Sequence, residues 1–290
     1  MKKTTSCFEN LKRFFINAFV NAEISRSEID NFFQDYLKYI FELNKLDITN
    51  YDILISKAEI NEYHSKREKT YKHTANKECR NLIKRRVLTK ASFRANSGNH
   101  YFDAMMSCHP TIPNKFDIVI NKNLCHAHND EEIIELINLF YVFGHEAHHV
   151  IQYITRPKEM ERYDYLQELH YEYLRSANQV VNSPKEVRKL KRAINQHLHV
   201  MYSHCKPEKF ANKKAYDYLD ILFNQIIASL APITTIEEDM FYNFIQTLKN
   251  RNKQIYLFSD FDDMLTDLKY GDSLERLINF PVEEDLLNIN

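Results

Sequence analysis

One segment near the middle of the chain constrains it more than any other. Residues 142–152 read VFGHEAHHVIQ, an apolar helical stretch that contains the pattern His-Glu-x-x-His at His145, Glu146 and His149. Residues four apart lie on the same face of a helix. His145 and His149 can therefore offer two imidazole nitrogens to one metal ion, while Glu146 points about 100° away round the helix. His148 occupies a neutral position of the pattern.

This pattern is typical of zinc metallopeptidases, in which the two histidines bind zinc and the glutamate is the general base. The alternative interpretation is a polar cluster on a helix surface. The apolar surroundings favour the metal site, because an unpaired histidine or glutamate is costly to bury. The sequence therefore predicts zinc as a cofactor, with His145 and His149 as ligands and Glu146 as the catalytic base.

Composition excludes several other classes of protein. Hydrophobic residues make up 44% of the 290 residues, enough for a substantial core, and a net charge of −1 implies no bulk electrostatic partner. Three glycines are too few for a glycine-rich phosphate loop or for an all-β chain with many tight turns. No apolar run approaches the length of about 20 residues that spans a membrane. We therefore expect no membrane partner.

Cysteine usage and the N-terminus bear on the compartment. The five cysteines are odd in number, scattered and without a Cys-x-x-Cys pair, which indicates a reducing compartment. The apolar segment 14–22 is short for a signal core and is interrupted by Asn17. We therefore expect a cytoplasmic protein, although delivery elsewhere by a route that the sequence does not reveal stays open.

Periodicity and capping signals predict a mainly α protein with a small β-sheet (α+β) around a zincin-like core. Ser25 with Glu28 resembles a capping box, as does Thr235 with Glu238. Residues 116–121 are expected to form a strand, with 101–106 as its partner. The predicted helices cover 8–22, 28–44, a stretch from about Tyr51, 130–154, 158–181, a stretch from Ser183 to about His204, 208–230, 235–250, 259–270 and a short one from Asp272.

Three regions are expected along the chain, which can also form one continuous domain. They are a helical N-terminal region at 1–94, a zincin-like catalytic core at 95–182 and a helical C-terminal region at 183–290. Within the first, residues 66–94 are strongly basic. A solvated helix face explains this segment better than a phosphate-binding or acidic-partner surface, because it lacks the interleaved aromatic residues of a stacking platform. We expect no nucleic-acid partner.

Catalytic zinc usually takes three protein ligands, so a third must be found. The metzincin pattern requires a glycine and a histidine where this chain has Gln152 and Thr155, which excludes that class. The candidates that follow the motif are Asp164, Glu168, His170 and Glu172.

With Glu168, the chain resembles the gluzincins, the thermolysin-like and aminopeptidase-type metallopeptidases. Those proteins take a glutamate from the next helix at a spacing close to the 18 residues that lie between His149 and Glu168. They often carry an aspartate four residues after that ligand, which hydrogen-bonds to a zinc-binding histidine. Glu172 stands at this position. The resemblance implies Glu168 as ligand with Glu172 behind it.

A weaker similarity to the ImmA/IrrE-like metallopeptidases rests on the pair Ala177-Asn178. In that group a glutamate precedes Ala-Asn by two residues, where this chain has Leu174. The similarity keeps Glu172 as the alternative ligand, with His170 and Asp164 after it.

The predicted function is hydrolysis of a peptide or protein substrate by metal-activated water, with Glu146 taking the proton and delivering it to the leaving amine. Strand 116–121 is expected to pair with extended substrate. Tyr202, His204 and also Tyr242 are candidates for a transition-state donor. Two rival functions stay open. One is a non-enzymatic helical protein that binds nucleic acid or an acidic partner through 66–94. The other is a degenerate zincin with a structural metal.

Overall fold

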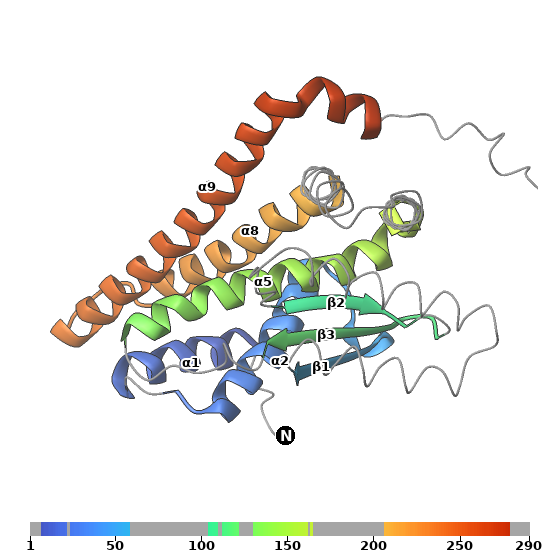
Figure 1. Ribbon diagram of the computed structural model, residues 1–290. Helices are drawn as coiled ribbons and strands as arrows, with labels where there is room; N and C mark the ends of the chain where they lie inside the picture. The colour runs from blue at the N-terminus through green and yellow to red at the C-terminus, as the bar shows by residue number, and fades with distance from the viewer. Residues whose placement is uncertain are drawn as a thin grey trace, which may run out of the picture.

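The computed structural model describes residues 7–21, 24–58, 104–109, 112–121, 130–161, 163–164 and 206–278. The protein is mostly helical with a small mixed sheet, which confirms the predicted fold class (Figure 1). The elements are α1 (Cys7–Asn21), α2 (Arg26–Leu43), the 3-10 helix η1 (Ile48–Asn50), β1 (Asp52–Ala58), β2 (Ala104–Cys108), β3 (Lys115–Asn121), α5 (Asp130–Thr155), α8 (Lys206–Ala228) and α9 (Ile236–Ile278).

The first two helices form where the sequence predicts them. The capping box at the start of α2 is complete: the Glu28 backbone N–H donates to Ser25 Oγ at 3.3 Å, and the Ser25 N–H donates to Glu28 Oε2 at 2.9 Å. This reciprocal pairing satisfies two of the backbone N–H groups that a helix start leaves without partners. The apolar faces of α1 and α2 then pack together and against the rest of the core.

The three strands lie in the order β1-β3-β2 (Figure 1). β3 pairs with β1 in parallel and with β2 in antiparallel fashion, so its backbone is used on both edges. The predicted strand 116–121 is therefore confirmed, and its predicted partner 101–106 overlaps β2. The expectation that strand 116–121 pairs with substrate is wrong, because a central strand has no edge left for an added strand.

The helix predicted from Tyr51 is also wrong, since β1 begins at Asp52. Ile53 and Ile55 are partly buried against the core, whereas Leu54 between them is 54% exposed. This alternation has the period of a half-buried strand. Pairing along β3, which is distant in the sequence, decides the outcome over local helix signals.

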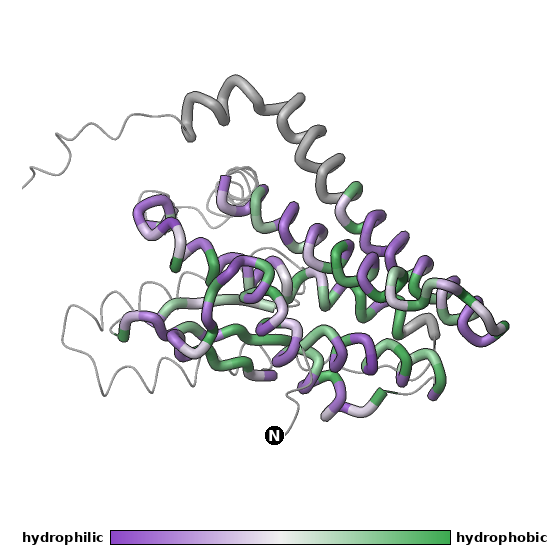
Figure 2. The backbone as a smooth tube through the Cα atoms, turned by 180° about the vertical axis from the view of Figure 1, so that it is seen from behind, coloured by the Kyte–Doolittle hydropathy of each residue, from purple (hydrophilic) through white to green (hydrophobic). Residues whose placement is uncertain are grey.

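Helix α5 crosses the middle of the molecule. The sheet and α2 lie on one side of it, and α8 and α9 lie on the other (Figure 1). Its first half packs into an aromatic cluster, in which Phe140 stacks on Phe32 at 4.0 Å between ring centroids and Phe143 lies 4.8 Å from Phe33. Hydrophobic and hydrophilic residues alternate along the surrounding helices, as expected for helices with one buried face (Figure 2).

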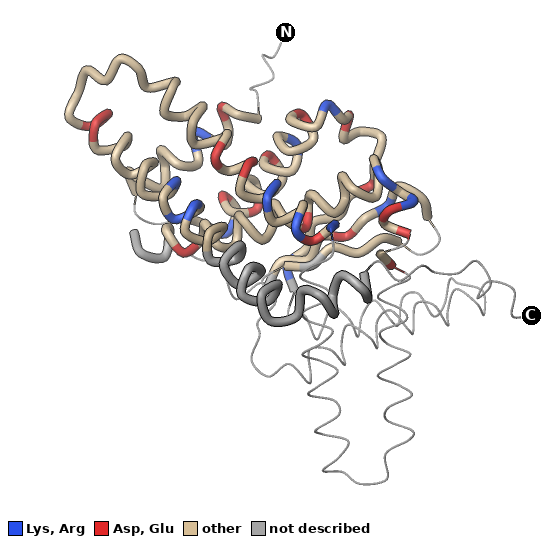
Figure 3. Tube along the Cα trace, turned by 90° about the horizontal axis from the view of Figure 1, so that it is seen from above, with Lys and Arg blue, Asp and Glu red and all other residues tan. Residues whose placement is uncertain are grey.

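The core joins residues from all three regions of the chain that the sequence suggests. Phe33, Phe143 and Phe223 belong to one buried cluster, and each is fully or almost fully buried. Lysine and arginine are interspersed with aspartate and glutamate over the described elements (Figure 3). None of the described helices is both long enough and apolar enough to cross a membrane.

The predicted helix ends near Asn250 and at Gly271 are wrong, because α9 runs unbroken from Ile236 to Ile278. Its start is as predicted: the Glu238 N–H donates to Thr235 Oγ1 at 3.1 Å, and the Thr235 N–H donates to Glu238 Oε2 at 3.0 Å. No proline interrupts this stretch. A single interior glycine costs about 1 kcal/mol relative to alanine but removes no backbone hydrogen bond.

Several predictions fall outside the described residues. They concern the basic segment 66–94, most of the predicted helix 158–181 and the stretch from Ser183 to His204. The start of the second of these is described: α5 ends at Thr155 and helical structure resumes at Pro157. Proline fits this position because the first residue of a helix has no intrahelical use for its N–H.

Candidate metal centre

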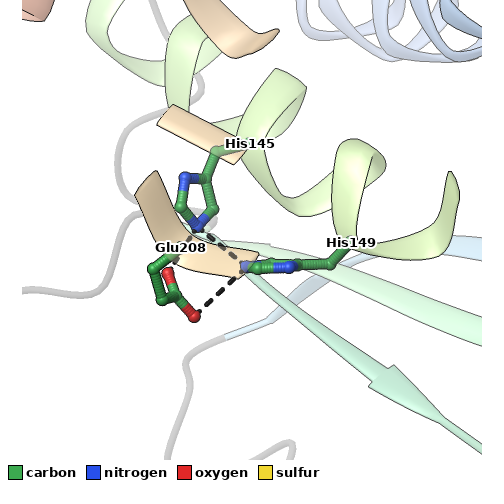
Figure 4. A group of neighbouring side chains, drawn as sticks. All are labelled: His145, His149 and Glu208. Atoms are coloured by element: carbon green, nitrogen blue, oxygen red, sulfur yellow. Dashed lines mark hydrogen bonds and ion pairs between the residues drawn. The ribbon is translucent and has the colours of Figure 1, made fainter. Parts of the chain in front are cut away.

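Helix α5 presents His145 and His149 one turn apart on the face directed at α8 (Figure 4). Their Nε2 atoms lie 3.0 Å apart, and the rings meet edge to face with 4.6 Å between centroids. His149 is buried at 4% exposure, while His145 is half-buried. The spacing of the motif therefore brings the two nitrogens together as the sequence predicts.

A carboxylate from the first turn of α8 closes the group. Glu208 Oε2 lies 3.0 Å from His145 Nε2, and Oε1 lies 3.3 Å from His149 Nε2 (Figure 4). Glu208 is itself buried at 4% exposure. Among the described residues these three side chains form the group that could hold a metal ion.

The donor set fits zinc in kind and in size. Two histidines and one glutamate are a common ligand set of catalytic zinc, which keeps a fourth position open. Two nitrogens bound to zinc at about 2.0–2.1 Å and at a tetrahedral angle lie about 3.3 Å apart. The three distances of 3.0, 3.0 and 3.3 Å between donor atoms are close to this value. The side chains are thus placed to converge on one ion with small outward shifts.

The outer nitrogen of each histidine contacts an amide oxygen. His145 Nδ1 lies 2.8 Å from Asn212 Oδ1, and His149 Nδ1 lies 2.7 Å from Gln152 Oε1. An amide oxygen only accepts hydrogen bonds, so each Nδ1 carries the proton. In a neutral ring, Nε2 then has a lone pair directed at the shared point, which is the state that a metal requires.

Without a cation, the centre holds its charge as an ion pair. Burial lowers the pKa of His149, but the charge and hydrogen bond of Glu208 outweigh burial and raise this pKa to about 9. Burial raises the pKa of Glu208, but the two histidines hold it well below its usual value. The proton on His149 thus occupies the place that a metal cation would take, since metal binding displaces ligand protons.

Glu146 lies beside this group and is not one of its three members. Its Oε2 accepts a hydrogen bond of 2.6 Å from the backbone N–H of Met106 in β2. Its charge also acts on His149. The sheet therefore orients the carboxylate that the motif predicts as the base.

Two of the residues that the sequence offered as a third ligand or a transition-state donor lie within the described part of the chain. Asp164 accepts a hydrogen bond of 2.6 Å from the Tyr153 hydroxyl, and Tyr242 is half-buried on α9. Outside the described residues lie the preferred third ligand, its alternatives and the two main donor candidates: Glu168, His170, Glu172, Tyr202 and His204.

Sequence reasoning missed Glu208, because it searched the helix next in the chain. The chain between His149 and Glu208 is much longer than the chain between His149 and Glu168. A signal was present nonetheless: Asn212 follows Glu208 by four residues, the same relation that was expected for Glu172 after Glu168. Residues four apart share a helix face, so one helix can supply both a ligand and the group that orients a histidine.

Two further residues complete the surroundings of the three ligands. The Tyr163 hydroxyl donates a hydrogen bond to Glu208 Oε1, and its ring stacks on His149 with 6.2 Å between centroids. Gln152 Nε2 donates to the Pro207 carbonyl at 2.9 Å, which ties α5 to the start of α8.

Comparison of the chain with protein-family models, with curated proteins and with solved structures finds no match.

Proposed function

We propose that this protein is a zinc-dependent metallopeptidase in which His145, His149 and Glu208 hold the metal and Glu146 is the general base. The observation that carries the proposal is the convergence of the three donor groups beside the motif glutamate. Zinc bound there would supply a Lewis acid that activates water and polarises the scissile carbonyl.

The remaining chemistry belongs to Glu146. Its Oε2 accepts a hydrogen bond from the Met106 backbone N–H, which leaves Oε1 to take a proton from the attacking water and deliver it to the leaving amine. The backbone contact holds the carboxylate in one orientation through both transfers. The substrate is a peptide or protein, and the free thiol of Cys7 supports a reducing compartment, the cytoplasm.

The resemblance to gluzincins supports this proposal in one respect and departs in another. The relation between Glu208 and Asn212 follows the gluzincin pattern, with asparagine in place of the usual aspartate, and Asn212 contacts the first histidine of the motif. The interval from His149 to Glu208 is much longer than the gluzincin interval. Glu168 remains the rival third ligand.

A second candidate function is a zincin-like protein with a structural metal. The observation that favours it is burial: the side chains of His145, His149 and Glu208 are only 14%, 6% and 5% exposed. Structural zinc sites are closed, whereas catalytic ones leave a position for water. The two functions differ in what happens when Glu146 is changed.

The ligand set is tested by zinc content. Glu208→Gln keeps the size of the side chain and removes its charge, so purified protein should lose stoichiometric zinc, as should His149→Ala. Glu168→Ala should keep one zinc per chain. If Glu168→Ala empties the site while Glu208→Gln does not, the third ligand is Glu168 and the assignment of Glu208 fails.

The activity is tested by Glu146→Gln, measured on a mixed pool of fluorescence-quenched peptides. This variant should keep its zinc and its fold but lose hydrolysis by about 10²–10⁴-fold, the typical contribution of a general base. Glu161→Gln, at an exposed position in the turn of helix after Pro157, is the matched control and should retain activity. Equal activity of wild type and Glu146→Gln would contradict the peptidase. A zinc-loaded wild type that cleaves no peptide in the pool would favour the structural metal.

A further inference from the structure

We propose that Asn212, Gln152 and Tyr163 are the positioning residues of the metal centre, each holding one ligand in its binding state. This inference rests on the proposed metal site. It adds that all three contacts come from uncharged side chains, so among the three ligands and these three residues only Glu208 carries a negative charge.

Asn212 holds His145. Its Oδ1 lies 2.8 Å from His145 Nδ1, and its own backbone carbonyl accepts a 2.9 Å hydrogen bond from the Tyr141 hydroxyl. Tyr141 lies one turn before His145 on α5, so two residues of α5 contact Asn212, one at its backbone and one at its side chain. Because Asn212 also follows Glu208 by one turn, α8 sets the ligand and the histidine orientation together.

Gln152 holds His149 and uses both ends of its amide to do so. Oε1 faces His149 Nδ1 at 2.7 Å, while Nε2 donates to the Pro207 carbonyl at 2.9 Å. The side chain is 3% exposed, so neither contact can be replaced by bulk water. Gln152 thereby links the second histidine to the residue directly before Glu208.

Tyr163 holds Glu208. Its hydroxyl donates to Oε1, the oxygen that also lies 3.3 Å from His149 Nε2. The other oxygen, Oε2, faces His145 Nε2 at 3.0 Å. The tyrosine ring stacks on His149 with an interplanar angle of 21°, which fixes the hydroxyl against the carboxylate. The hydrogen bond orients Glu208 without adding a charge.

Because these three contacts are uncharged, two substitutions of Asn212 are expected to change zinc affinity in opposite directions. A carboxylate that accepts from an imidazole N–H makes the ring a stronger ligand and adds attraction for a cation. Asn212→Asp should therefore bind zinc more tightly than wild type. Asn212→Leu keeps the volume and removes the acceptor, so it should bind zinc about 10–100-fold more weakly. General damage to the fold would weaken binding in both variants.

The experiment is chelator competition for Zn²⁺, with Co²⁺ as a second probe, on the full chain at pH 7.5. We expect Asn212→Asp to bind Zn²⁺ more tightly than wild type. We expect about 10–100-fold weaker Zn²⁺ binding in Asn212→Leu, Gln152→Met and Tyr163→Phe. Asn224→Asp is the matched control: it adds the same charge to an exposed position of α8, about 18 Å further along the helix, and should leave affinity unchanged.

A second readout reports the contacts themselves. The hydrogen-bonded Nδ1–H protons of His145 and His149 should give separate downfield proton signals in nitrogen-15-labelled protein. The His145 signal should move further downfield in Asn212→Asp and disappear by exchange in Asn212→Leu, while the His149 signal should respond in this way to Gln152→Met.

The outcomes separate this inference from the proposed function. If wild type binds zinc and Asn212→Asp binds it no more tightly, the positioning role of Asn212 is overturned. If the predicted order of affinities is found but Glu146→Gln has no effect on hydrolysis, the positioning residues stand and the peptidase fails. If wild type binds neither Zn²⁺ nor Co²⁺, the metal centre itself is refuted.

Discussion

The two halves of helix α5, up to Gly144 and from His145 onward, have different roles. In the first half, Phe140 and Phe143 lie in an aromatic cluster with Phe14, Phe32 and Phe33 from α1 and α2. These contacts are apolar, and aromatic pairs tolerate several relative orientations. The first half therefore stabilises the fold through area and packing.

The second half also has an apolar side, where Ala147, Val150 and Ile151 join the core, but it adds polar contacts that each have one direction. His145 contacts Asn212 and Glu208 on α8, and His149 contacts Glu208, at distances between 2.8 and 3.3 Å. Gln152 Nε2 donates to the Pro207 carbonyl at the start of α8 at 2.9 Å. A hydrogen bond weakens steeply when its angle is poor, and a buried polar group without a partner is costly. The polar residues of this half therefore tolerate little change in side-chain type, and their arrangement serves binding more than stability.

The largest effect that separates the two halves is expected from Phe140→Ala. Loss of this fully packed ring should lower the free energy of unfolding by about 3–5 kcal/mol, as large-to-small changes at buried aromatic residues do. Zinc affinity of the folded fraction should stay at the wild-type value. Denaturant titration with the metal chelated gives the stability, and chelator competition gives the affinity.

Phe140→Leu is the control, since it keeps most of the buried volume and should lose clearly less stability than Phe140→Ala. A Phe140→Ala protein that unfolds at the wild-type denaturant concentration, or one whose folded form has lost zinc, would show that the two halves of α5 are not independent.

An effect of intermediate size and opposite sign is expected from Tyr36→Phe. The Tyr36 hydroxyl is buried and has no hydrogen-bond partner within the described part of the chain, and it lies 3.2 Å from where a Cβ on Gly144 would stand. A buried hydroxyl without a partner costs about 1–3 kcal/mol. Removing it should raise the free energy of unfolding by about 1 kcal/mol in the same denaturant titration.

Tyr36 belongs to α2 and places a polar group against the apolar half of α5, where its ring lies 6.0 Å from that of Phe143. Tyr39→Phe is the matched control: its hydroxyl donates to Gln225 Oε1 at 2.8 Å, so its removal should destabilise instead. Destabilisation of equal size in both variants would mean that the Tyr36 hydroxyl has a partner that stabilises the fold.

The smallest effect is expected at the start of α2, where directional contacts are exposed. Ser25→Ala removes a helix cap and should lower the free energy of unfolding by about 1 kcal/mol at pH 7. The Ser25 side chain and backbone N–H hold the pKa of Glu28 below its usual value of 4.5. A lowered pKa contributes stability above the unfolded value, and this contribution is lost as pH falls through the folded value.

The difference between Ser25→Ala and wild type should therefore be full above pH 4.5 and shrink below it. Denaturant titrations at several pH values between 3 and 7 measure it. A difference that grows as pH falls would be the wrong sign for a carboxylate that the cap stabilises, and would refute this account of the capping box.

Local sequence alone determined the parts of this protein whose causes lie within one turn of helix. Ser25 with Glu28 and Thr235 with Glu238 marked two helix starts, because a cap is made by residues three apart. His145 and His149 were placed together for the same reason, since the helix itself carries one to within 3.0 Å of the other. The short apolar run in 116–121 likewise identified β3.

Tertiary structure decided what depends on partners distant in the chain. Asp52–Ala58 became a strand because β3 offered it an edge, and Ile236–Ile278 stayed one helix although capping signals recur within it. Glu208 joined the histidines because α8 packs against α5, although a long stretch of chain separates the two helices. Spacing along a sequence predicts neighbours on one helix, whereas a ligand from another helix is set by packing, which buries apolar area without regard to sequence distance.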